Sequence, residues 1–180
     1  MSEAWIETFN GVRFDILETR PEMIQIEDIA HALSQMNRFT GHCRFPYPVA
    51  QHSRLGSLLI HPDHALQFLL HDASEAYLGD MNRPMKHYTE AGAVYRVIEK
   101  RIQTVIYERF GCPAHEHSLV KDMDDEMLYA EKAQLMGDLP WETRWGKSDK
   151  AADVKLIETS FRENKRLFLE RFYQLYKSNY

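Results

Sequence analysis

Four residues whose side chains ligate metals stand out in this sequence. They are a histidine in VAQHS, a His-Asp pair in LLHDASEAY and an aspartate in VKDMDDEM, namely His52, His71, Asp72 and Asp124. Each falls on or beside the apolar stripe of a predicted helix, where burying an unpaired charge costs several kcal/mol. A shared cation removes that cost, so these residues predict one divalent-metal site and, with it, hydrolytic chemistry.

Helical phase selects one aspartate from the DMDDE segment. On a helix, Asp124 shares a face with Val120 and Met127, whereas Asp122 and Asp125 turn toward lysines. Any one such residue is more often a hydrogen-bonded core side chain or a solvated one. Their occurrence on three separate helical stripes favours the metal site over that reading.

The donor set narrows the choice of metal. Two imidazoles and two carboxylates suit a transition metal with open water positions better than they suit Ca²⁺ or a closed structural zinc. We therefore expect one divalent transition metal, with Co²⁺, Mn²⁺, Zn²⁺ and Fe²⁺ all chemically admissible.

Composition indicates an ordinary soluble globular chain of 180 residues, with 44% hydrophobic and 27% charged residues. No apolar run reaches the ~18–20 residues of a membrane span, and the N-terminus lacks a secretory pattern. The widely separated Cys43 and Cys112 favour reduced thiols, so a cytoplasmic location is expected. A net charge of −5 argues against binding of duplex nucleic acid.

The helices and strands that would position these residues can be predicted from sequence patterns. They indicate an all-α fold with a short N-terminal β-hairpin. Two β-prone runs, 5–9 and 12–16, flank Asn10-Gly11, the usual signal for a type I′ turn. A 3.6-residue period of apolar residues and terminal Gly and Pro residues then place helices at about 21–36, 48–60, 62–78, 90–110, 114–137 and 152–176. Loops are expected at 38–48, around Arg83-Pro84, and at 138–149, which holds Trp141 and Trp145. No linker divides the chain, so we expect a single domain over 1–180 with its core at about 20–140.

The arrangement H…HD…D resembles that of the HD-domain metal-dependent phosphohydrolases. The segment HDASEAYLGDMNRPMKHY resembles the bacterial 5′-deoxynucleotidases and the small phage-type deoxynucleotide (dATP) triphosphohydrolases. The segment IEDIAHALSQMNRFTGHCRFPYPVAQHS is similar to the small phage and proteobacterial members. The resemblance covers roughly Phe9 to Gly137 and is specific over 26–86. It implies an HD-type helical bundle in which His52, His71, Asp72 and Asp124 are the metal ligands.

The resemblance also implies the reaction. A metal-bound water would attack a phosphoester or phosphoanhydride bond of a (deoxy)nucleotide, with a deoxynucleoside mono- or triphosphate as the expected substrate. Asp72 and Glu75 are the expected catalytic residues, and Glu75 would act as general base or would position the water. A further Mg²⁺ is an option with a triphosphate. From its position alone, Glu75 has an equal claim to be a solvated helix carboxylate.

Five residues are the expected substrate contacts. Arg38, Arg83 and Lys86 lie in predicted loops beside the metal helices, where cations can meet phosphoryl oxygens. The resemblance directs Asp80 toward the sugar, and Phe39 is expected to stack on a base. The alternatives are solvated surface charges for the three cations, helix termination for Asp80 and core packing for Phe39.

Two further residues and the end of the chain carry open alternatives. His42 could protonate a leaving group, and the inward Glu131 could orient a ligand histidine or cap loop amides. The final helix is expected to be core or a dimer face, and its end, RFYQLYKSNY, hints at a homo-oligomer. The rival functions are a phosphodiesterase or alarmone hydrolase, and a non-catalytic, metal-stabilised nucleotide sensor.

Overall fold

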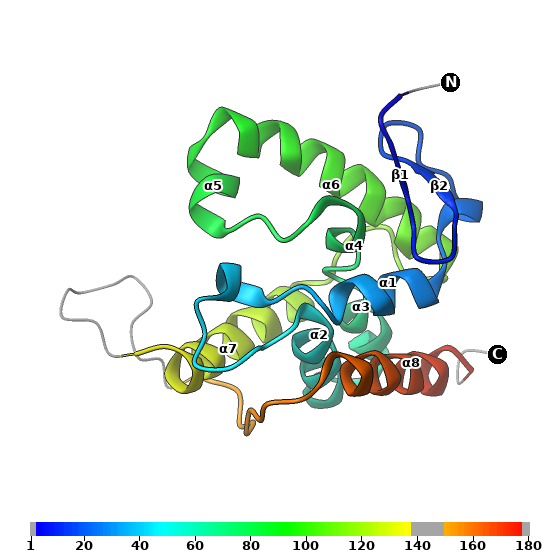
Figure 1. Cartoon of the computed structure of the whole chain (residues 1–180). Coiled ribbons are helices and arrows are strands. Elements are labelled where there is room, and N and C mark those ends of the chain that lie inside the picture. The colour runs from blue at the N-terminus through cyan, green and yellow to red at the C-terminus, as the bar shows by residue number, and fades with distance from the viewer. Residues whose placement is uncertain (1–2, 138–149, 178–180) are drawn as a thin grey trace.

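A two-stranded hairpin opens the chain, and helices form most of the described structure after it (Figure 1). The computed structural model describes residues 3–137 and 150–177, so the predicted loop at 138–149 with Trp141 and Trp145 lies outside the described residues. Strand β1 (Trp5–Glu7) pairs antiparallel with β2 (Arg13–Asp15). The predicted all-α fold with an N-terminal hairpin is confirmed.

The hairpin turn differs from the type I′ turn predicted at Asn10-Gly11. The Gly11 amide donates to the Thr8 carbonyl at 2.9 Å, and the Thr8 amide donates to the Val12 carbonyl at 3.0 Å. Gly11 has a φ of 76°, whereas a type I′ turn would also need a positive φ at Asn10, which Asn10 does not have. The connection is therefore the longer form, with a left-handed glycine after the turn. The Asp28 carboxylate accepts the Asn10 amide at 2.8 Å, a tertiary contact that local sequence cannot reveal.

Four helices lie where periodicity placed them, although the first is shorter than predicted at both ends. They are α1 (Ile26–Leu33), α2 (Val49–Leu59), α6 (Glu90–Arg109) and α7 (Ser118–Leu135). The first was predicted to begin at Pro21, but Pro21–Met23 form a separate 3₁₀ turn, η1, and Ile24 is extended. The helix α7 begins later than predicted because the backbone of 113–117 is bonded to the side chain of Gln67 instead of to itself.

Three predictions of helix and loop need correction. The helix expected at 62–78 is η3 (Pro62–His64), α3 (Ala65–Leu69) and α4 (Glu75–Leu78), separated by turns at 70–74. The loop expected at Arg83-Pro84 is α5 (Arg83–Tyr88), because Asn82 caps it and a proline suits its first turn. The last helix, α8 (Phe161–Lys177), begins at 161 and not at 152, because the preceding backbone is bonded to α7: the Ala152 amide donates to the Glu126 carbonyl, and Gln134 bonds Val154 and Leu156. The expected loop at 38–48 contains the 3₁₀ turn η2 (Arg38–Gly41).

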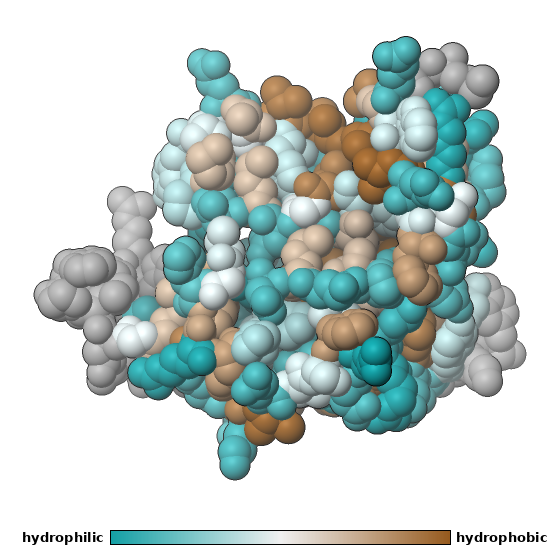
Figure 2. All heavy atoms as spheres, viewed as in Figure 1, coloured by the Kyte–Doolittle hydropathy of each residue, from teal (hydrophilic) through white to brown (hydrophobic). Residues whose placement is uncertain are grey.

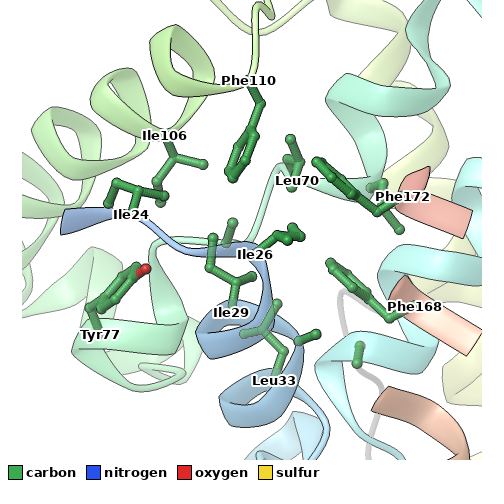
Figure 3. Packing of buried hydrophobic residues seen from close by; sticks show 14 of the residues in the cluster. Ile24, Ile26, Ile29, Leu33, Leu70, Tyr77, Ile106, Phe110, Phe168 and Phe172 are labelled. Carbon is green, nitrogen blue, oxygen red and sulfur yellow. The ribbon is translucent and has the colours of Figure 1, made fainter. Parts of the chain in front are cut away.

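The main core joins α1, the C-terminal half of α6, the α3–α4 segment and α8 (Figure 3). Phe168 and Phe172 of α8 are buried in this core beside Leu70 and Phe110. Of the two alternatives for the final helix, its apolar stripe is therefore core.

A glycine brings the two histidine-bearing segments together. A Cβ atom on Gly56 of α2 would lie 2.1 Å from the ring of Phe68 of α3, so only glycine lets these helices approach so closely. His52 precedes Gly56 by one turn, and His71 comes three residues after Phe68. The contact therefore sets the separation of the two imidazoles.

Hydrophilic residues cover much of the face seen in Figure 2, while hydrophobic ones gather over α6 and between α6 and the hairpin. Among the described helices, none is both long enough and apolar enough to cross a membrane.

Candidate metal centre and pocket

Donor atoms from three segments converge where α2, the 70–74 turn and α7 meet. The Nε2 atoms of His52 and His71 lie 3.4 Å apart. The Asp72 Oδ2 atom lies 3.8 Å from the first nitrogen and 3.3 Å from the second. A cation with ligand bonds of about 2.0–2.2 Å holds neighbouring donors roughly 3.0–3.5 Å apart. These three residues therefore form a group that could hold a metal ion.

Asp124 faces the same two nitrogens from α7. Its Oδ1 atom lies 3.4 Å from the His52 Nε2 and 3.8 Å from the His71 Nε2. The neighbouring Asp125 is half-buried and pairs with Lys121 at 2.5 Å, and Lys121 also contacts the other carboxylate oxygen of Asp124 at 3.2 Å. The helical phase thus separated the two aspartates correctly.

The outer nitrogens of both imidazoles are engaged in a way that suits metal binding. The His71 Nδ1 lies 2.7 Å from the Phe68 carbonyl, which can only accept, so this nitrogen carries the proton. The His52 Nδ1 lies 2.6 Å from the Glu131 carboxylate and donates in the same way. In the neutral rings both Nε2 lone pairs then point into the space between the donors, the tautomer that a metal-ligating histidine needs.

Glu131 links the two charged partners of this centre. It is fully buried in α7, and its second oxygen accepts from the Arg38 Nε at 3.0 Å. Burial opposes ionisation of Glu131, but Arg38 and His52 outweigh it and lower the pKa of the carboxyl. Of the two alternatives for Glu131, orienting a ligand histidine is the one the geometry bears out.

The ionisable groups hold the centre in a charged network. Burial opposes protonation of His71, but Asp72 and Asp124 outweigh it and raise its pKa to about 9. Burial likewise opposes ionisation of Asp124, yet hydrogen bonding to His52 and His71 lowers its pKa well below the ordinary value. Arg38 Nη1 donates to Asp72 at 3.3 Å and supplies further positive charge. In this structure the positive charges of Arg38 and of protonated His71 therefore balance the carboxylates that a bound metal would otherwise neutralise.

A cavity of about 950 Å³ opens beside the donors. It is lined by His71, Asp72 and Asp124, and by every other catalytic or substrate contact that the sequence predicted: Arg38, Phe39, Glu75, Asp80, Arg83 and Lys86. His42 lines it too, whereas His52 lies behind the wall. The fold therefore gathers residues from 38 to 124 around one hollow.

Glu75 is a buried carboxyl with an unused oxygen. It starts α4 and lines the cavity, and its Oε2 has no hydrogen-bond partner among the described residues. Burial, with the charges of Asp72 and Asp80, raises its pKa well above the ordinary value. The alternative of a solvated helix residue is thus excluded by its burial.

The predicted substrate-contact residues differ in whether their side chains already form ion pairs within the protein. Lys86 donates to Glu99 of α6 at 2.7 Å, and Arg38 is bonded to carboxylates of the metal centre. Arg83 is exposed at the start of α5 and forms no ion pair within the described part of the chain. Burial raises the pKa of Asp80, which stands at the cavity wall.

The η2 turn that presents Phe39 is strained. Phe39 and Thr40 have φ values of 55° and 56°, a left-handed conformation that costs a non-glycine residue roughly 1–2 kcal/mol. Hydrogen bonds on both sides hold it, from the Arg38 amide to Tyr47 at 3.0 Å and from the Arg44 amide to Leu135 at 2.9 Å. Such strain is typical of functional loops.

Two glutamines that brace this site were not predicted from the sequence. Gln67 holds the carbonyls of Pro113 and His115 at 3.1 and 2.9 Å, which fixes the pocket wall next to α7. Gln103 of α6 contacts the 70–74 turn. A polar residue at an inward helical position was the available signal, but only the fold reveals its partners.

The fold and the donor set define a class, an all-α protein with a His/Asp cluster able to hold a metal. No family model matches the chain. It is 38% identical over 132 residues to the uncharacterised protein YfdR of Escherichia coli, covering 73% of this chain and 72% of YfdR. It is also 38% identical over 123 residues to an uncharacterised protein of Rhodobacter capsulatus, covering 63% of this chain and 62% of that protein. The chain belongs to the same family as YfdR.

Proposed function

We propose that the protein is a divalent-metal-dependent phosphohydrolase that cleaves a phosphoester or phosphoanhydride bond of a deoxynucleotide. The observation that carries the proposal is the convergence of the His52, His71 and Asp72 donors beside an open cavity, which His71 and Asp72 line. Its volume of about 950 Å³ lies within the ~300–1,000 Å³ of small-molecule sites. The HD-type sequence pattern supports the same class of reaction.

The donor set fits a transition metal held by His52, His71, Asp72 and Asp124. Such an ion, when bound, would acidify a coordinated water and polarise a phosphoryl oxygen. Glu75 supplies the proton chemistry. Its raised pKa and unpaired oxygen suit a group that exchanges a proton during the reaction.

The rest of the cavity wall suits a nucleotide. Arg83 and Lys86 place positive charge at one side, where they neutralise phosphoryl oxygens, and Arg38 lies between the metal ligands and Phe39. Asp80 offers an acceptor to a sugar hydroxyl, and Phe39 offers a ring face to a base.

A product assay tests this proposal. Metal-free protein is supplied with Co²⁺, Mn²⁺, Zn²⁺ or Fe²⁺ and incubated with dAMP, dATP, a cyclic dinucleotide and an alarmone nucleotide, and products are separated by ion exchange. We expect metal-dependent release of phosphate from dAMP, or of triphosphate or phosphate from dATP. Products only from the cyclic dinucleotide or alarmone would replace the substrate class. Saturable binding without product under every metal would overturn catalysis in favour of a sensor.

A further inference from the structure

The His71-Asp72 pair lies where the main-chain helix is interrupted. Between α3 and α4, the Leu70–Ser74 turns are held by bonds such as the Ala73 amide to Leu70 at 3.0 Å, which span three residues. A continuous α-helix would instead join the Ser74 amide to the Leu70 carbonyl. That bond is absent from this described segment.

The side chain of Gln103 occupies the place of the missing bond. Its Oε1 accepts from the Ser74 amide at 3.0 Å, and its Nε2 donates to the Leu70 carbonyl at 2.7 Å. One amide from α6 thus satisfies both ends of a broken helical hydrogen bond. Insertion of a polar group into the helical ladder is a known cause of a local kink.

We propose that Gln103 is a positioning residue that holds the turn open so that His71 and Asp72 both face the metal centre. Consecutive residues of a regular helix point about 100° apart. In the open turn their Nε2 and Oδ2 atoms lie 3.3 Å apart on one site. Without the inserted amide, the Ser74–Leu70 bond can close and rotate the two donors away from each other. This inference rests on the proposed metal centre.

The chain provides a matched control. Gln134 of α7 makes the same two-ended clamp, accepting from the Leu156 amide at 3.0 Å and donating to the Val154 carbonyl at 2.8 Å. It does not line the cavity. Gln103→Met and Gln134→Met each remove one such clamp and keep side-chain length, and Gln134→Met also removes a hydrogen bond to the Ala130 carbonyl at 3.3 Å.

The test measures Co²⁺ affinity by calorimetry and Co²⁺ coordination by its visible absorption spectrum, with thermal unfolding alongside. We expect Gln103→Met to weaken Co²⁺ binding about 10–100-fold and to change the spectrum, at a stability loss similar to that of Gln134→Met. Gln103→Glu, which keeps the acceptor for Ser74 but loses the donor, should fall between. Unchanged affinity and spectrum in both Gln103 variants would overturn the positioning role alone. No Co²⁺ binding by the wild-type chain would overturn the metal centre itself.

A second, independent observation concerns the outer face of α6. Val94 and Val97 are 62% and 72% exposed there, and Tyr88, at the end of α5, is 74% exposed. Figure 2 shows hydrophobic residues over this helix. The same helix carries Glu90 and Arg101, both exposed, and Glu90 forms no ion pair with any described residue.

Four of these residues on α6 are arranged so that the same face of a second helix would complement them. Glu90, Val94, Val97 and Arg101 follow the four-three-four spacing by which one helix face meets another. An antiparallel pairing about a two-fold axis between the valines sets Val94 against Val97 of the partner subunit. It also sets Glu90 against Arg101 of the partner subunit. Arg101 donates one N–H to the Ile16 carbonyl at 2.8 Å and retains others for a carboxylate.

We infer that the occupant of this face is a second copy of the chain, paired through α6 in antiparallel orientation. Charge exchange tests the orientation as well as the surface. Light scattering should find a dimer for the wild type, a monomer for Val97→Glu, and a dimer for Leu58→Glu, a control at a 51% exposed leucine of α2. Glu90→Arg and Arg101→Glu should each weaken the dimer, and the two together should restore it. A monomeric wild type, or a double variant weaker than either single one, would overturn the inference.

Discussion

The two histidines of the candidate metal centre are held in different ways. His52 lies inside the regular helix α2, and a carboxylate from α7, Glu131, fixes its outer nitrogen at 2.6 Å. His71 lies in an interrupted turn, and its outer nitrogen is fixed at 2.7 Å by the carbonyl of Phe68, three residues earlier. One ligand is oriented by a distant charge, and the other by the local course of the backbone.

The centre can be divided into a His52 half, with Glu131 and Arg38, and a His71 half, formed by the 70–74 turn. The two halves should tolerate different substitutions. Because Glu131 is an ionised partner, the His52 half depends on a buried charge that Arg38 stabilises. The orientation of His71 depends on the shape of the 70–74 turn, so it should respond to backbone constraints. Substitutions in the two halves can therefore separate electrostatic from geometric control of one site.

Removal of a ligand from either half should have the largest effect. Asp72→Ala and His52→Ala each delete a donor to one shared ion, so both should lose bound metal and activity together. Asp125→Ala is the matched control, because its carboxylate pairs with Lys121 on the outside of α7. Elemental analysis checks the outcome. Full metal content in either ligand variant, or metal loss in Asp125→Ala with Asp124→Ala unaffected, would contradict the ligand set.

Glu75→Gln should have the next largest effect on activity, because it removes the proton acceptor and leaves both histidines unchanged. A general base contributes about 10²–10⁴-fold, so turnover should fall by that order while metal content and nucleotide affinity stay near wild type. Steady-state kinetics with elemental analysis measures both. An equal fall in metal occupancy would make Glu75 a ligand, and unchanged turnover with chemistry rate-limiting would remove it from the mechanism.

Glu131→Gln tests the His52 half alone. The amide keeps the shape but removes the charge opposite His52 and Arg38, so metal affinity should fall about 10–100-fold. The Co²⁺ spectrum should change less than in Gln103→Met, because the backbone around the ligands is intact. A larger spectral change in Glu131→Gln than in Gln103→Met would reverse the assignment of electrostatic and geometric control.

The pH dependence of metal binding tests the His71 half. In the metal-free protein its pKa of about 9 keeps the imidazole protonated at neutral pH, so metal binding must displace a proton. Affinity should rise by up to about tenfold per pH unit toward pH 9 and then level off. Because the folded-state pKa is raised, the stability His71 contributes is complete below its ordinary pKa and is lost as pH rises through about 9. Calorimetry at several pH values measures the trend, and a flat profile would contradict it.

The sequence predicted the regular helices of the site better than the interrupted turn. Periodicity located α2 and α7 and chose Asp124 over Asp125, because both helices are regular and amphipathic. It missed the break at 70–74, where Gln103 from a helix far along the chain bonds the Ser74 amide and the Leu70 carbonyl. It also predicted a loop at Arg83-Pro84, although the cap at Asn82 makes proline a helix starter. Where a side chain distant in sequence replaces a main-chain hydrogen bond, the local sequence pattern cannot predict the change.

A metal titration of the metal-free protein with Co²⁺ or Mn²⁺, with nucleotide hydrolysis followed at each step, tests most directly whether one bound ion drives the reaction. If it does, activity rises in proportion to bound metal and stops rising at one ion per chain. Asp72→Ala should then gain neither metal nor activity over the same range. Activity that is already present without metal, or that stays absent when one ion is bound, would contradict a metal-dependent hydrolase.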